Sequence, residues 1–337
     1  MKVAVCYNQV PTQQPYGMPQ DRLSEAGAET EARAVLDALR QLGHHPALIP
    51  LGDEIVSFTG KLHLLRPTVV FNLCEGFHGY SWHEMHVGGL FDLLGLPATG
   101  SPALTLGLTR DKALTKDLFV RHGIPTPDYH LIGPGQPLPR LSYRAPLIVK
   151  PAHEDASLSL TWQSVVTTEK SLKKQVALIH ETYRQTALVE EFIEGREFNV
   201  ALLGNNPCRV LPIAEIRFDP DLPRSIVSYQ GKWQEDSADF KGTLPICPAE
   251  LNGREKKTIE QVALKCWRLL GCRDYARVDI RWRSGVPYVL EINANPDISP
   301  DAGLARAARC AGIEYPALVG GILDMAAARK GKDHEHA

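Results

Sequence analysis

The sequence predicts a protein of mixed α/β and α+β class, built from three successive blocks. In residues 1–108, short β-rich runs alternate with segments of helical spacing that stop at glycine, a pattern typical of a small doubly wound parallel sheet. Residues 109–194 combine helices and strands with a polar loop of phosphate-binding size between two strands. Residues 195–337 contain several strands and one long helix. We therefore expect an N-terminal α/β domain followed by two α+β subdomains, with boundaries accurate to a few residues.

Hydrophobic periodicity and capping residues place the individual elements. The first helix is predicted from apolar residues at helical spacing, such as Ala28, Ala32 and Val35. Gly43 ends it, and Thr109 is the expected N-cap of a later helix. The expected helices cover residues 24–42, 83–94, 111–122, 171–183 and 252–270. The expected strands cover residues 2–7, 45–50, 69–73, 147–150, 164–167, 187–192, 198–203, 209–216, 276–282 and 287–292.

Composition narrows the classes of partner. The 337-residue chain is 44% hydrophobic with a formal charge of -2, so its charge gives no reason to expect a nucleic acid or an anionic membrane as a partner. No apolar run approaches the roughly 20 residues of a membrane helix. The seven cysteines are odd in number and include no C-x-x-C pair, which suits reduced thiols. We expect a cytoplasmic protein that acts on small molecules.

The sharpest chemical signal lies near the C-terminus, where two predicted strands are joined by a short turn. Arg277 and Asp279 lie on the first strand, and Glu291 and Asn293 on the second. Because side chains alternate along a strand, each pair shares one face. Two carboxylates and an amide oxygen form a hard-oxygen site suited to Mg²⁺, which usually also binds nucleotide phosphates. A surface salt bridge would explain any one of these residues, but the whole set favours a metal site.

Two lysines and an acidic segment are candidate partners for a nucleotide. Lys150 ends an apolar strand and precedes a proline, so a rigid element carries its ammonium group. Lys112 begins a helix, where its positive charge opposes the helix dipole. A lysine with a purely structural role would be better placed at the other end of the helix, so this position favours a functional role. Residues 190–197 form an acidic segment whose backbone could pair with an adenine edge while a carboxylate bonds the ribose. Each feature alone is weak, because most lysines and glutamates are simply solvated.

Six motifs in order give the chain a resemblance to the ATP-grasp superfamily, and within it to the D-alanine–D-alanine ligases. The resemblance covers nearly the whole chain, and the order and spacing of the motifs make it specific. The motifs are Pro97-Ala-Thr-Gly-Ser101, Thr109-Arg-Asp-Lys112 with Lys116, Leu147-Ile-Val-Lys-Pro151, the segment from Glu190 to Glu197, Tyr229-Gln-Gly-Lys232 with Cys247-Pro248-Ala249, and Arg277-Val-Asp279 with Leu290-Glu291-Ile-Asn293.

The resemblance implies an ATP-grasp fold and a role for each motif. It implies a ligase that uses ATP with Mg²⁺ or Mn²⁺ to convert a carboxylate to an acyl phosphate, which an amine then attacks. The implied metal ligands are Asp279, Glu291 and Asn293. The implied nucleotide-binding residues are Lys112, Lys150, Glu190, Phe192, Ile193, Glu197 and Leu290. The implied catalytic residues are Arg277, Lys232 and Ser157.

The phosphate loop, residues 153–159, departs from the family pattern. Asp155 and Ser159 stand where the family has glycines, which let backbone N–H groups approach phosphate closely. Aspartate tolerates positive φ better than most residues, but its charge opposes phosphate unless magnesium or a lysine offsets it. Ser157 keeps one hydroxyl. We expect the loop to close over ATP in an altered form.

The substrate-binding residues differ more than the catalytic ones. Asp297 replaces a family glycine and brings a carboxylate to the acceptor pocket, and Glu75 or His78 occupies the place of a family histidine. The resemblance also assigns Tyr229 to the substrate side. Retained catalytic motifs with altered recognition residues suggest a ligase for another amino acid or small peptide, and we hypothesise an acceptor with positive charge near Asp297.

Several alternatives stay open at the level of sequence. His78, His83 and His86 with Glu84 could form a zinc site, but histidines on a helix face are more common than zinc ligands. A dehydrogenase is disfavoured because no G-x-G-x-x-G follows the first strand. A genuine D-alanine–D-alanine ligase, a glutathione-synthetase-like ligase and a non-catalytic module that binds ATP or a peptide remain. Dimers are common among similar ligases, which leaves a homodimer open.

Overall fold

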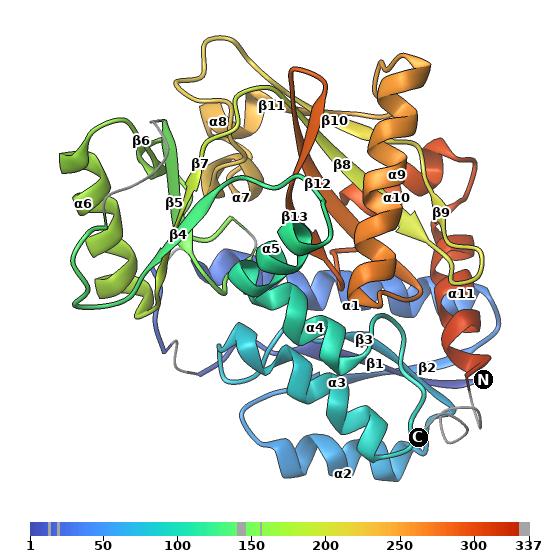
Figure 1. Ribbon diagram of the computed structural model, residues 1–337. Helices are drawn as coiled ribbons and strands as arrows, with labels where there is room; N and C mark the ends of the chain where they lie inside the picture. The colour runs from blue at the N-terminus through green and yellow to red at the C-terminus, as the bar shows by residue number, and fades with distance from the viewer. Residues whose placement is uncertain (13–14, 19–20, 140–145, 156, 330–337) are drawn as a thin grey trace.

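The computed structural model describes residues 1–12, 15–18, 21–139, 146–155 and 157–329. Within these residues the strands form three sheets, with strand orders β2-β1-β3, β4-β7-β5-β6 and β11-β10-β8-β12-β13, and β9 pairs with β8 (Figure 1). The strands are β1 (Lys2–Asn8), β2 (His45–Leu51), β3 (Val69–Leu73), β4 (Tyr129–Ile132), β5 (Leu147–Pro151), β6 (Val165–Val166), β7 (Ala187–Glu191), β8 (Arg196–Leu203), β9 (Arg209–Val210), β10 (Ala214–Phe218), β11 (Thr243–Ile246), β12 (Tyr275–Arg283) and β13 (Val286–Asn293).

Helices cover the sheets, and several of them begin at a residue whose side chain caps the first turn. In the clearest case, the Asn252 side chain accepts the N–H groups of Arg254 and Glu255, and Glu255 in turn accepts the N–H of Asn252. The α-helices are α1 (Arg22–Gln41), α2 (Ile55–Leu65), α3 (Glu84–Leu93), α4 (Ala103–Arg110), α5 (Lys112–Arg121), α6 (Glu169–Leu178), α7 (Tyr229–Trp233), α8 (Ala238–Lys241), α9 (Gly253–Leu270), α10 (Gly303–Cys310) and α11 (Tyr315–Ala327). Short 3-10 or π segments are η2 (Ser81–His83), η3 (Trp162–Ser164) and η4 (Ile179–Tyr183).

The N-terminal sheet is parallel and buried on both faces. Strand β1 pairs in parallel with β2 and β3. Alternating residues of β1 point to opposite faces, so Val3 and Val5 join the core that contains α1, while Ala4 and Cys6 join the core that contains α2 and α3. Helices on both faces are what a doubly wound sheet requires.

The other two sheets are antiparallel and carry the chemical motifs. In the four-stranded sheet, β7 lies between β4 and β5. In the larger sheet, β12 lies between β8 and β13, and α9 packs on one face through residues such as Ile259, Ala263 and Trp267. The opposite face of β12 and β13 is therefore left to line the space between the two antiparallel sheets.

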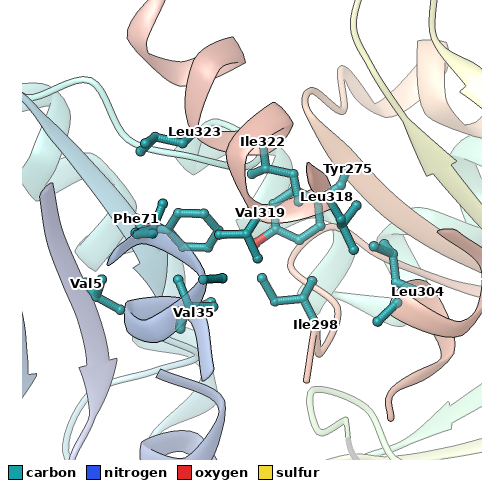
Figure 2. Packing of buried hydrophobic residues seen from close by; sticks show 14 of the residues in the cluster. Val5, Val35, Phe71, Tyr275, Ile298, Leu304, Leu318, Val319, Ile322 and Leu323 are labelled. Carbon is teal, nitrogen blue, oxygen red and sulfur yellow. The ribbon is translucent and has the colours of Figure 1, made fainter. Parts of the chain in front are cut away.

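The last helices return to the N-terminal sheet and share its core. Helix α11 packs against α1 and β3. Figure 2 shows Val319 of α11 beside Phe71 of β3, while Leu318 of the same helix lies near Tyr275 of β12. Residues from both ends of the chain thus form one continuous hydrophobic cluster.

The structure differs from the sequence predictions at several element boundaries. The predicted N-cap Thr109 lies inside α4, and Asp111 caps α5 instead by accepting the N–H of Leu114 at 2.9 Å. An aspartate competes well for this position, since its side chain readily accepts the exposed N–H groups of a first turn. The single strand predicted over residues 209–216 is divided into β9 and β10.

Candidate active site

A cavity of about 1170 Å³ is lined by residues from all three sheets. Its lining includes Glu75 after β3, Lys150 of β5, and Asp279 and Glu291 of the β12–β13 pair. The largest sheet supplies one wall, and the loop after β5 supplies the other. Any chemistry of the C-terminal motifs would take place here.

The predicted metal ligands converge on one face of β12 and β13. In the register of these strands, Asp279 lies opposite Glu291, and Arg277 lies opposite Asn293. The Asn293 Nδ2 atom donates to Asp279 Oδ2 at 3.2 Å, and all four side chains line the cavity. Two carboxylates and an amide at this spacing are a donor set that fits Mg²⁺.

Arg277 and Asn199 hold the Asp279 carboxylate in place. Arg277 binds it in a bidentate manner, with Nε–Oδ1 at 2.7 Å and Nη2–Oδ2 at 2.8 Å. Asn199 on the neighbouring strand β8 donates to Oδ1 at 2.8 Å. Asn199 was not predicted from the sequence, because its role depends on the pairing of β8 with β12.

A bulge brings two consecutive residues of β13 to the cavity. Asp279 pairs with Glu291 but the next residue, Ile280, pairs with Val289, so Leu290 has no partner in the ladder. As a result both Leu290 and Glu291 line the cavity, where strict alternation would have put them on opposite faces.

Lys112 lies at the start of α5 and is only 3% exposed. Its Nζ atom lies 2.9 Å from Asp155 Oδ1 and 3.7 Å from Glu291 Oε2, and it also donates to the Glu154 carbonyl. Burial alone would lower the pKa of Lys112, but Asp155 and Glu291 outweigh this effect and raise it. Lys112 is therefore a fixed positive charge beside the predicted metal site.

Glu190 binds two lysines at once. Its carboxylate lies 2.8 Å from Lys116 Nζ and 2.8 Å from Lys150 Nζ, and its side chain is 1% exposed. Burial would raise the pKa of Glu190, but the two lysines outweigh this effect and lower it. Glu190 thus orients Lys150 toward the cavity.

The remaining nucleotide-binding candidates line the same cavity near Arg281. Glu197 binds Arg281 Nη2 at 2.6 Å, and the Arg281 guanidinium lies 5.5 Å from the ring centre of Phe192. Phe192, Ile193 and Glu197 all line the cavity. Arg281 was missed, although its position two residues after Asp279 on the same strand face could have revealed it.

The phosphate loop is held by a charge network that the sequence analysis did not predict. Arg110 Nη1 lies 2.5 Å from Asp155 Oδ2, and Arg110 also pairs with Glu84. Glu84, one of the residues of the zinc site considered as an alternative, therefore forms an ion pair with Arg110. Positive φ values occur at Ser157 (58°) and Ser159 (69°). Residue 156 of the predicted loop lies outside the described residues.

The substrate-side candidates gather at another end of the cavity. Glu75, His78 and Asp297 are part of its lining, and so are the catalytic candidates Lys232 and Ser157. Lys232 lies on α7 with its Nζ atom 4.9 Å from the Trp233 ring centre. Of the predicted site residues, only Tyr229 is absent from the described lining of the cavity. Its side chain is 1% exposed and packs near Trp233.

One carboxylate at this end was missed by the sequence analysis. Glu31 of α1 lines the cavity, is 7% exposed and accepts the N–H of Ile298 at 2.8 Å. Burial raises the pKa of Glu31 well above its usual range, and Asp297 and Glu75 add to the effect. Burial and the neighbouring Glu84 also raise the pKa of Glu75, to about 7.

Comparison with known proteins places the chain among the ligases that its motifs resemble. Residues 119–324 match the family model "D-ala D-ala ligase C-terminus". A D-alanine–D-alanine ligase of Bordetella parapertussis is 32% identical over 85% of this chain and 89% of its own length. The chain belongs to the D-alanine–D-alanine ligase family. As a member, it is an ATP-dependent ligase that forms C–N bonds.

Other relatives of this family support the same assignment. The uncharacterized protein y4sG of Sinorhizobium fredii is 36% identical over 93% of this chain and 90% of its own length. A crystal structure of a D-alanine–D-alanine ligase from Bacillus anthracis, complexed with ATP, superimposes with a TM-score of 0.77 over 99% of each chain at 22% identity. The ATP-grasp fold predicted from the sequence is thereby confirmed. Within the described residues, no helix is long and apolar enough to cross a membrane.

Proposed function

We propose that this ligase joins an amino acid or small peptide to an amine through an acyl phosphate. One observation carries the proposal: Asp279 and Glu291 face each other on adjacent strands, with Lys112 Nζ 3.7 Å from Glu291, in the cavity that Lys150 also lines. Oxygen ligands beside fixed ammonium groups suit a triphosphate and its cation. Asp279, Glu291 and Asn293 would hold Mg²⁺ or Mn²⁺, which when bound offsets phosphate charge.

In the proposed first step, a substrate carboxylate oxygen attacks the γ-phosphorus of ATP, and ADP leaves. Lys112 and Lys150 would bind the phosphate oxygens, and Phe192, Ile193, Glu197 and Leu290 would bind the nucleoside. Ser157 and Lys232 would contact the transferred phosphate. Such positioning and neutralisation of charge are what phosphoryl transfer needs from a protein.

In the proposed second step, an uncharged amine attacks the acyl carbon. The C–N bond forms, phosphate leaves with the former carboxylate oxygen, and the amine loses a proton. Arg277, held rigidly by Asp279, would face the oxyanion of the tetrahedral intermediate. Glu75, His78 and Asp297 would contact the substrates. The buried Tyr229 would support the substrate side indirectly, through its contact with Trp233, which lines the cavity.

The substrates proposed here differ from two D-alanines. Three carboxyl groups, those of Asp297, Glu75 and Glu31, line the substrate end, and burial raises the pKa of Glu75 and of Glu31. The alternatives are a genuine D-alanine–D-alanine ligase and a module that binds ATP without ligation. All seven cysteines are free, which suits a reducing cytoplasm as the place of reaction. A homodimer stays a prediction.

Glu291→Gln tests the proposed chemistry. The variant should lower amine-stimulated phosphate release by about 100-fold or more, because a neutral amide binds a divalent cation poorly. Release is measured with mixtures of amino acids, and the product is identified by mass spectrometry. Glu260→Gln on the outer helix α9 serves as the control and should behave as wild type. Phosphate release by neither wild type nor variant would favour the non-catalytic module.

A further inference from the structure

Arg110 connects the phosphate loop to the helices beside it. It is the last residue of α4, is 7% exposed and lines the cavity. Its Nη2 atom donates to Glu84 of α3, and its Nη1 atom donates to Asp155 Oδ2 at 2.5 Å. The guanidinium thus joins α3 to the loop after β5 by two charge-assisted hydrogen bonds. Arg110 has no part in the two proposed steps of ligation.

Asp155 carries a negative charge inside the phosphate loop. One oxygen of its carboxylate contacts Arg110, and the other lies 2.9 Å from Lys112 Nζ. Burial would raise the pKa of Asp155, but Arg110, Lys112 and Lys232 outweigh burial and hold the pKa well below its usual range. The carboxylate is therefore ionised at neutral pH. A phosphate group that approaches the loop meets a like charge unless a cation offsets it.

The preceding carboxyl group of the loop, that of Glu154, has a different environment. Tyr16 donates to Glu154 Oε1 at 2.6 Å, and Gln185 donates to the same oxygen, so both of these partners are neutral. Burial raises the pKa of Glu154 above its ordinary value. The environment thus disfavours the charge of Glu154 and favours that of Asp155. Of the two, Asp155 is the one whose charge needs an offset when phosphate binds.

The two cations that contact Asp155 differ in their relation to the nucleotide. Lys112 Nζ also lies 3.7 Å from Glu291 Oε2, beside the proposed metal site, and is proposed to bind phosphate oxygens. While its ammonium group binds a phosphate, it cannot fully offset Asp155. Arg110 contacts the other oxygen of Asp155 and is held from behind by Glu84, whose side chain is 4% exposed. The bond between Arg110 and Asp155 therefore does not depend on Lys112.

Neutral contacts hold the same part of the loop where Arg110 can reach it. Ser81 Oγ donates to the His153 carbonyl at 2.9 Å, and the Trp82 ring lies 5.3 Å from the His153 ring, centre to centre. The next residue of the loop is bound by Tyr16. Residues 153–155 are thus each bound by a side chain from an earlier part of the sequence. Arg110 supplies the charged contact of this set.

We propose that Arg110 is a positioning residue for phosphoryl transfer, which holds Asp155 and offsets its charge while Lys112 binds the phosphates of ATP. This inference rests on the proposed function and adds to it a residue that acts through Asp155 instead of touching the nucleotide. It also explains how a loop with an aspartate where the family pattern has a glycine accepts a triphosphate. Without Arg110, the phosphates would bind beside an uncompensated carboxylate, and their affinity would fall.

The test places Arg110→Gln in three backgrounds: wild type, Asp155→Asn and Glu84→Gln. Calorimetric titration with Mg²⁺ and a non-hydrolysable imido analogue of ATP gives the dissociation constant of each variant. In wild type, Arg110→Gln should weaken binding by about tenfold or more, because Asp155 loses its counter-ion. In the Asp155→Asn background the loss should be less than about threefold, since no charge then needs an offset. In the Glu84→Gln background it should again be about tenfold or more, since Asp155 is still charged.

AMP is the control ligand, because it lacks the β- and γ-phosphates. Its affinity should change by less than about threefold in every variant, whereas a damaged fold would weaken the binding of both ligands. The Glu84→Gln background also protects the test against misfolding, since Arg110→Gln then leaves no buried carboxylate of α3 without its cation. Circular dichroism of each variant checks that it is folded.

The outcomes separate this inference from the proposed function. Equal losses in the wild-type and Asp155→Asn backgrounds would overturn the inference. A loss that disappears in the Glu84→Gln background would overturn it too, because Arg110 would then act through Glu84. Equal weakening of AMP and of the triphosphate analogue, or no binding of the analogue to wild type, would also overturn it. Without amine-stimulated phosphate release the ligase proposal fails, while the titrations still decide the role of Arg110.

Discussion

At the scale of single residues, Glu190 illustrates how charge is arranged around the cavity. Its carboxylate is almost completely buried and lies between the ammonium groups of Lys116 and Lys150. Breaking a buried ion pair by removing one partner costs far more than the pair itself contributes, since an uncompensated charge remains. Here removal of Glu190 would leave two such charges.

Glu190→Gln should therefore lower the free energy of unfolding by about 3–5 kcal/mol. The pKa of Glu190 is depressed in the folded protein, so its contribution is present above the ordinary glutamate range, near pH 4.3, and is lost as the pH falls below that range. The variant should lack this part of the acid dependence. Urea unfolding at several pH values measures both effects. Glu169→Gln, which removes an exposed pair with Lys173, should change neither.

At the scale of elements, the phosphate loop is strained at Ser159, where the family pattern has a glycine. Ser159 adopts a φ of 69°, is 4% exposed, and its hydroxyl has no hydrogen-bond partner among the described residues. A left-handed conformation at a residue with a Cβ atom costs of order 1 kcal/mol. The loop is held in spite of this cost by the pairing of Asp155 with Arg110 and Lys112.

Ser159→Gly should raise the free energy of unfolding by about 1 kcal/mol, because glycine adopts this φ without strain. Chemical denaturation measures the change. Ser159→Ala is the matched control, since it removes the hydroxyl but keeps the Cβ atom. An equal gain in both variants would assign the effect to the unpaired hydroxyl instead of the backbone.

At the scale of the whole molecule, contacts between distant segments join the first and last parts of the chain. The Arg329 guanidinium binds Asp274 with Nη1–Oδ1 at 2.6 Å and Nη2–Oδ2 at 2.7 Å, and donates to the Ala98 carbonyl at 2.6 Å. Asp274 is completely buried and also accepts the N–H of Gly100. This pair lies beside the hydrophobic cluster that α11 shares with the N-terminal sheet.

Arg329→Ala should lower the free energy of unfolding by about 3–5 kcal/mol, because it leaves Asp274 buried without its cation. Thermal unfolding should still show one transition, since the shared core couples both ends of the chain. Arg254→Ala on the exposed face of α9 should have little effect. A variant that melts in two separate steps would show that the N-terminal sheet folds without the last helices.

Sequence reasoning predicted local features better than contacts between blocks. The shared face of Arg277 and Asp279 follows from strand periodicity, and the structure confirms it. The bulge at Leu290 breaks that periodicity, so it could not be predicted in the same way. Glu31 and Arg110 were missed because their partners, Ile298 and Asp155, lie far away in the sequence. Such contacts depend on tertiary packing, which no local pattern encodes.

The ion pairs of Lys112 and Lys150 have a consequence for how a nucleotide enters. Both ammonium groups have carboxylate counter-ions, which are Asp155 and Glu291 for Lys112 and Glu190 for Lys150. The positive charge of both lysines is therefore already offset. The phosphate oxygens of an incoming triphosphate must displace these carboxylates before they can bind the ammonium groups. Of these carboxylates, Glu291 is also a proposed metal ligand, so a bound divalent cation would compete with Lys112 for it, and the binding of nucleotide and of metal would depend on each other.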